Sequence, residues 1–283
     1  MVSDGGMMTS AARGWISIGI LGLLAQAGAA QDPTPPKLEL RIAAEGWGEA
    51  PTSNIEAVLR SAAGTLLPRF PGHPLPVLEI SRSTKDPITL YKRGPAGEIR
   101  VKLDVEGLLW ARFAFQFAHE LGHVFCGVEE YPNPNLWFEE TLCETSSLYA
   151  LSRMAETWKT RPPYPNWADY APELKKYRDE RIRNSSEKLP EGMSLKEWFR
   201  EKEPKLRADP HLRAANLTLA AELLPLFEEA PEHWEALLSL NKVHGDATRT
   251  LARYLGDWSR SAPEKHRDFI WAIAARLGAT PDR

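Results

Sequence analysis

The sequence has little excess charge, few cysteines and no internal repeat. Its 283 residues include 35 Lys and Arg against 38 Asp and Glu, so the formal net charge is only −3. A protein that binds nucleic acid or an anionic membrane through electrostatic attraction carries a clear basic excess. We therefore expect no nucleic-acid partner. The sequence does not specify an oligomeric state.

The first thirty residues have the pattern of an export signal. Arg13 precedes an apolar run at 15–25, and the small residues at 27–30 offer a cleavage site. The run is too short for a comfortable membrane span, and no cysteine stands near the cut to accept a lipid. We predict a signal peptide at 1–30 and a periplasmic or secreted protein without stable membrane insertion after cleavage. An uncleaved anchor is the alternative.

Strand-like patterns precede helix-like patterns along the rest of the chain. Four segments have the apolar patterns of strands: 38–42, 77–80, 88–91 and 98–103. A helical pattern covers 53–67, and from residue 108 onward the pattern is almost wholly helical. This order predicts an α+β fold. We expect a domain with a small N-terminal sheet at 31–156 and a mainly α-helical C-terminal lobe at 157–283.

The most informative pattern is HELGH at 119–123, inside a predicted helix at 108–125. Residues four apart on a helix share a face, so His119 and His123 can bind one Zn²⁺ ion. Glu120 then reaches the water on the metal and serves as general base. The alternative is a helical histidine pair without a metal.

A catalytic zinc ion needs a third protein ligand and one open position. The next predicted helix begins near Leu136, after a turn whose residues Asn133 and Asn135 can cap it. This helix carries three candidate carboxylates, on Glu139, Glu140 and Glu144. We expect the third ligand among them.

Here the chain resembles the gluzincins, the thermolysin-like and aminopeptidase-like zinc peptidases. Their second helix carries the glutamate ligand in a Trp-x-x-Glu context, which residues 137–140 match. The resemblance implies a zincin-like fold, Glu140 as the third ligand and Glu144 as a hydrogen-bond partner of His119. Glu139 and Glu144 are the alternative ligands. A carboxylate on the far ring nitrogen would fix the tautomer of that histidine.

The resemblance covers about residues 98–149. The spacer between His123 and Glu140 is shorter than in most gluzincins, and Thr141 replaces a common glycine. The Gly-x-Met-Glu-Asn signature of aminopeptidases is absent, which argues against that exopeptidase activity. The rival metzincin pattern needs glycine at 126 and histidine at 129, where this chain has Cys126 and Glu129. Glu129 is the only candidate ligand for that arrangement.

Cys126 and Cys143 each follow a predicted ligand by three residues. If the two helices meet at the metal, a disulfide between them is one alternative in an oxidising compartment. A pair of buried thiols is the other. Ligation of zinc by a thiolate is a third option, but it would close the open position that hydrolysis requires.

These residues predict a zinc-dependent peptidase that acts on peptide or protein substrates, with one Zn²⁺ per chain. An extended peptide is expected to bind along the predicted strand at 98–103. Tyr131 is our candidate donor to the oxyanion; the others are Tyr149, Tyr170, Tyr177, His211 and His244. Two other functions remain as alternatives: a non-catalytic exported binding protein that keeps the fold, and a zinc hydrolase of a non-protein amide such as a cell-wall substrate.

Overall fold

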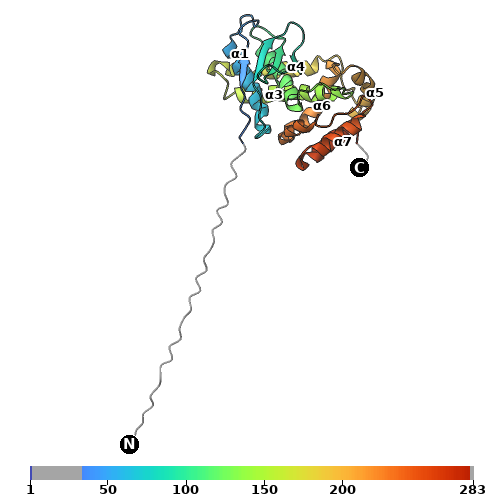
Figure 1. Cartoon of the computed structure of the whole chain (residues 1–283). Helices are drawn as coiled ribbons and strands as arrows, with labels where there is room; N and C mark the ends of the chain where they lie inside the picture. Colours follow the sequence, from blue (N-terminus) through green and yellow to red (C-terminus); the bar gives the residue numbers. More distant parts are fainter. Residues whose placement is uncertain (2–33, 281–283) are drawn as a thin grey trace. The chain divides into compact units, whose positions relative to one another are not determined.

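The computed structural model describes Met1 and residues 34–280 (Figure 1). Apart from Met1, the predicted signal peptide at 1–30 lies outside the described residues. Residues 34–280 belong to one compact unit, in which strands come first and helices follow. This order confirms the predicted α+β class. The division expected at residues 156 and 157 falls inside a helix, near its C-terminal end.

A small sheet forms the N-terminal part of this unit. Its strands are β1 (Leu40–Ile42), β2 (Leu78–Arg82), β3 (Ile88–Thr89) and β4 (Ile99–Leu103). The strand order is β1-β2-β4-β3, with β1, β2 and β4 parallel and β3 antiparallel to β4. All four strands overlap the segments predicted from apolar patterns.

The position of β4 corrects one expectation from the sequence. We predicted that the strand at 98–103 would present unpaired backbone groups to a peptide. Instead β4 lies between β2 and β3, and both of its sides are paired. Among the described residues, β3 is the edge strand on this side of the sheet, so β3 has the free backbone groups.

Helices α1 (Thr52–Leu66) and α2 (Trp110–Cys126) pack beside the sheet and against each other. On the apolar face of α2, the side chains of Phe113, Phe117 and Leu121 are fully buried. Its opposite face carries the histidine motif. The helix ends at Gly127, whose φ of 92° is a backbone conformation that glycine adopts without a steric penalty.

Helix α3 (Leu136–Trp158) is the central helix and is buried on nearly every side, which is typical of a helix enclosed by others. It packs closely on α2, where Gly122 faces Cys143. A Cβ atom on Gly122 would lie 2.9 Å from Sγ of Cys143 and 3.1 Å from its Cα. The absence of a side chain at this glycine lets the two helices approach.

The predicted capping of α3 is wrong for Asn135, whereas Oδ1 of Asn133 accepts a hydrogen bond from the backbone N–H of Asn135 at 3.0 Å, at the start of the helix. Asn135 occupies the N-cap position, but its side chain makes no capping hydrogen bond. It donates instead to the carbonyl oxygen of Arg249 and accepts from Arg207. A tertiary contact therefore takes the place of the local cap.

The remaining helices pack around α3 and along the C-terminal part of the chain (Figure 1). The α-helices are α4 (Ala171–Arg183), α5 (Leu195–Ala208), α6 (Arg213–Glu229), α7 (Leu251–Ser261) and α8 (Arg267–Leu277). Short 3₁₀ helices connect several of them: η1 (Leu67–Arg69), η2 (Pro165–Tyr170), η3 (Pro231–Ser239) and η4 (Glu264–His266).

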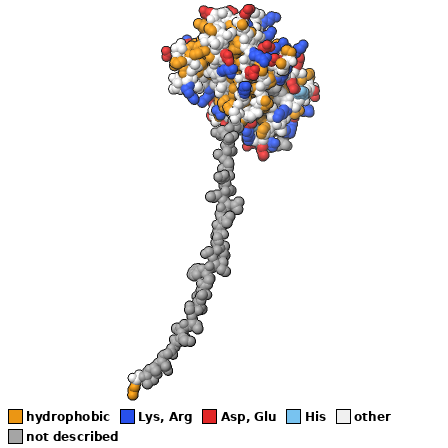
Figure 2. Space-filling view, turned by 60° about the vertical axis from the view of Figure 1, so that its left-hand side comes forward, with side chains coloured by type: hydrophobic (Ala, Val, Ile, Leu, Met, Phe, Trp, Pro, Cys, Tyr) orange, Lys and Arg blue, Asp and Glu red, His pale blue; other side chains and the backbone are white. Residues whose placement is uncertain are grey.

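No helix in the described part of the chain has the length and apolar character needed to cross a bilayer. Figure 2 shows acidic and basic side chains interspersed on the face in view. This mixed surface agrees with the small net charge.

Candidate metal centre

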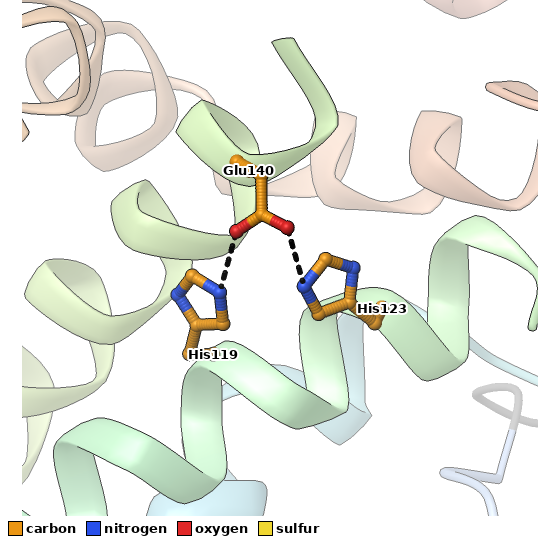
Figure 3. A group of neighbouring side chains, drawn as sticks. All are labelled: His119, His123 and Glu140. Carbon is orange, nitrogen blue, oxygen red and sulfur yellow. Dashed lines mark hydrogen bonds and ion pairs between the residues drawn. The ribbon is translucent and has the colours of Figure 1, made fainter. Parts of the chain in front are cut away.

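The two histidines of the motif project from α2 towards Glu140 on α3 (Figure 3). Nε2 of His119 is 3.1 Å from Oε2 of Glu140, and Nε2 of His123 is 3.6 Å from Oε1 of the same carboxylate. Two ligand atoms about 2.1 Å from a tetrahedral ion lie roughly 3.4 Å apart, so these spacings fit one Zn²⁺. The structure thus brings together the three residues predicted as ligands.

A second carboxylate faces the other ring nitrogen of each histidine. Nδ1 of His119 is 3.3 Å from Oε2 of Glu144, and Nδ1 of His123 is 2.7 Å from Oε1 of Glu139. In a zinc-bound site, each Nδ1 would carry a proton shared with its carboxylate, and each Nε2 would keep its lone pair for the metal. Glu144 therefore lies where the resemblance implied.

Sequence reasoning missed this role of Glu139, which we considered only as an alternative ligand. Neighbouring residues project about 100° apart around a helix, so Glu139 and Glu140 reach different sides of His123. The sequence signal that could have revealed this role is the pair of adjacent glutamates that follows the histidine motif. The result is a symmetrical arrangement, in which each imidazole lies between a predicted ligand and an orienting carboxylate.

Hydrogen bonds extend from Glu139 into the C-terminal part of the chain. Nδ2 of Asn241 donates to Oε2 of Glu139 at 2.7 Å. The hydroxyls of Tyr131 and Tyr254 donate to Oδ1 of Asn241 at 2.7 and 2.6 Å. The amide of Asn241 is thereby held in one orientation, and so is the carboxylate that orients His123.

This arrangement corrects the role predicted for Tyr131. Its hydroxyl donates to Asn241, and its ring stacks on His244 with the centroids 4.3 Å apart. Tyr131 is not among the residues that line the cavity at the site. Tyr131 therefore supports Asn241, which in turn holds the carboxylate that orients His123, and it does not face the cavity in which a substrate would bind.

A cavity of about 950 Å³ opens beside the predicted ligands, a size suited to a substrate. It is lined by residues around β3, by the exposed face of α2, and by parts of α3, α4 and α6. Glu120 lines it and is only 2% exposed, with Oε2 accepting a hydrogen bond from Thr89. His211 also lines it, with Nδ1 3.3 Å from Oε1 of Glu140.

Negative charge is concentrated around the two imidazoles. Four carboxylates surround them: Glu120, Glu139, Glu140 and Glu144. Burial by itself would lower the pKa of His119, but hydrogen bonds to Glu140 and Glu144 outweigh it and hold that pKa well above its usual value. Burial opposes ionisation of Glu140, yet the charge of His123 and the hydrogen bond from His119 hold its pKa far below the usual value. A divalent cation would balance this charge in place of the histidine protons, so the donor set fits a metal ion.

Two other ligand sets are less suitable. His123, Glu139 and Cys143 also have ligand atoms within 4.8 Å of one another. Cys143 is fully buried, however, and burial raises the pKa of its thiol well above the usual value. Glu129, the candidate ligand of the metzincin pattern, pairs instead with His244 at 3.0 Å and does not line the cavity.

Cys126 and Cys143 are both buried and free in the structure. This matches the second of the three alternatives described above, a pair of thiols that pack as small apolar groups. Burial also raises the pKa of the Cys126 thiol. A disulfide between them stays a prediction for oxidising surroundings.

Comparison of the chain with protein-family models, with curated proteins and with solved structures found no match. The function is therefore inferred from the geometry and chemistry of the candidate metal centre.

Proposed function

We propose that the protein is a zinc-dependent peptidase of the gluzincin type, with a zincin-like fold. The observation that carries this proposal is the group His119, His123 and Glu140, whose ligand atoms lie within 4.8 Å of one another beside an open cavity. A structural zinc site is closed by four protein ligands and needs no base. Three ligands, an open side and Glu120 at the cavity support a hydrolytic role.

The residues around the site have distinct tasks in this mechanism. A Zn²⁺ ion held there would supply a Lewis acid that polarises the scissile carbonyl and acidifies the attacking water. Glu120 takes the proton from that water and then passes it to the leaving amine. His211, which lines the cavity beside Glu140, is the candidate donor of a hydrogen bond to the oxyanion. Glu139 and Glu144 keep the two imidazoles oriented.

The free edge of the sheet supports a peptide as the substrate. The backbone N–H of Leu90 donates to the carbonyl of Arg100 at 2.9 Å, so these two residues form a hydrogen-bonded pair of the antiparallel ladder. The neighbouring residue Thr89 then directs its own N–H and C=O away from β4. Because β3 lines the cavity, an extended peptide can add there as a further strand.

Metal analysis combined with a cleavage assay tests the proposal. We expect one zinc ion per chain in the wild type and in Glu120→Gln, because Glu120 is not a ligand. Cleavage of unfolded casein and of quenched fluorescent peptides is expected to fall about 100-fold or more in Glu120→Gln. Glu129→Gln is the matched control, since Glu129 is 67% exposed and outside the cavity, and it is expected to behave as the wild type.

Each other outcome points to a different conclusion. Bound zinc with equal cleavage by the wild type and Glu120→Gln would contradict catalysis by this site. Bound zinc without hydrolysis of any substrate would favour a binding protein. Hydrolysis of cell-wall amides without hydrolysis of peptides would favour the non-protein substrate class. A wild-type protein that binds no zinc would remove the metal centre itself.

A further inference from the structure

Thr89, the residue with free backbone groups on β3, also contacts the proposed general base. Its Oγ1 is 2.8 Å from Oε2 of Glu120 and 3.3 Å from the carbonyl oxygen of Glu120. A threonine hydroxyl has one proton to donate, and the shorter contact is to the charged acceptor. Both side chains are shielded from solvent, with Thr89 7% and Glu120 2% exposed.

The hydrogen bond from Thr89 restrains the position of the Glu120 carboxylate. Within residues 34–280, no other group donates a hydrogen bond to it. The carboxylates of Glu139, Glu140 and Glu144 line the same cavity as Glu120. The hydroxyl of Thr89 holds Oε2 and leaves Oε1 free to accept a proton from water.

The same residue takes part in binding and in the orientation of the base. Its N–H and C=O face the free edge of β3, where a peptide strand would pair. Its side chain crosses to α2 and holds Glu120. A peptide that pairs with β3 would therefore fix the backbone from which this hydroxyl projects.

We propose that Thr89 is a positioning residue, which holds the carboxylate of Glu120 and links its placement to the binding of an extended peptide on β3. This inference rests on the proposed peptidase function. The proposed role concerns the orientation of the base. Loss of the Thr89 hydroxyl is therefore expected to lower the rate of the chemical step without removing the metal ligands or the backbone groups that bind the peptide.

Thr89→Val removes the hydroxyl and nearly preserves the shape of the side chain. We expect kcat to fall about tenfold or more while KM stays within about twofold of the wild type. Thr89→Ser restores a hydroxyl and is expected to recover most of kcat. Zinc content and the affinity for a peptide hydroxamate are measured in parallel, and both are expected to be unchanged in the two variants.

Thr218→Val is the matched control. Thr218 is also 7% exposed, and its hydroxyl lies 2.9 Å from the carbonyl oxygen of Glu187 and 3.0 Å from that of Ala214, outside the cavity lining. It is expected to lose stability without losing kcat. If Thr89→Val does not fold, Thr89→Ala takes its place in the comparison with Thr89→Ser.

The outcomes separate this inference from the function on which it rests. A folded Thr89→Val with the kcat of the wild type would overturn the positioning role alone. A variant that loses zinc, or a serine variant that recovers nothing, would also overturn it. Equal cleavage by the wild type and Glu120→Gln would overturn the proposed function, and the role of Thr89 with it.

Discussion

The close contact between α2 and α3 leads to a quantitative prediction for Gly122→Ala. A Cβ at this position would lie 3.1 Å from Cα of Cys143, a backbone atom that cannot rotate away. Carbon atoms in contact are about 3.5–4.0 Å apart, so the helices must separate by roughly 0.4 Å or more. Glu140 is on the same helix as Cys143, and its distance from the histidines would change with it.

Two opposing terms set the size of the effect. Overpacking of a buried contact costs about 3 kcal/mol at the upper end of the usual range. Alanine recovers about 1 kcal/mol of helix propensity relative to glycine. The net loss is about 2 kcal/mol, which lowers the unfolding midpoint by roughly 4–8 °C in a domain of this size.

Gly64→Ala provides the matched control, because Gly64 is exposed on α1 and a Cβ there would meet nothing within 4 Å. It is expected to gain about 1 kcal/mol from helix propensity alone. Denaturant unfolding of the metal-free proteins measures both changes, and zinc titration measures the weaker metal binding expected of Gly122→Ala. If Gly122→Ala raised the unfolding midpoint, as Gly64→Ala is expected to do, the close contact between α2 and α3 would be refuted.

Three further predictions concern other parts of the structure. Glu144→Gln is expected to weaken zinc binding about 10–100-fold, as measured with a competing chelator, because the Nδ1 proton of His119 loses its charged acceptor; unchanged affinity would contradict the orienting role. Burial lowers the pKa of His266 from its usual 6.5, so below pH 6.5 the unfolded chain binds more protons and stability falls as the pH is lowered. The stability difference between the wild type and His266→Gln, measured by urea unfolding at pH 7.5 and 5.5, is expected to show this loss, because the raised pKa values of His119, His123 and His211 change stability in the opposite direction in both proteins. In unreduced protein that is unfolded before alkylation, mass spectrometry is expected to find two modified cysteines, whereas none would show that Cys126 and Cys143 are bridged.

Most of the predicted ligand set could be read from the sequence because it depends on helical periodicity. The spacing of His119 and His123 places both on one face of any helix, and the same holds for Glu140 and Glu144. The two helices needed only to pack face to face for these four residues to meet. Helical periodicity does not choose among Glu139, Glu140 and Glu144, however; that choice came from the resemblance of residues 137–140 to the gluzincin pattern.

The parts that could not be predicted depend on contacts between distant segments. The apolar pattern of 98–103 indicates a strand but not its neighbours, and the two-residue strand β3 covers the side that we expected to be free. Tyr131 contacts Asn241 from 110 positions away, through packing that leaves no local signal. Asn135 has a good capping residue type, yet its side chain binds Arg249 because the C-terminal part packs over it.

The hydrogen bond between Glu139 and Asn241 has a consequence for the synthesis of the protein. The two residues are 102 positions apart, so α2 and α3 leave the ribosome well before the amide that completes this contact. Until then the carboxylate that orients His123 lacks its fixed donor. Chains that are truncated before Asn241 are expected to contain the whole histidine motif and still bind zinc weakly.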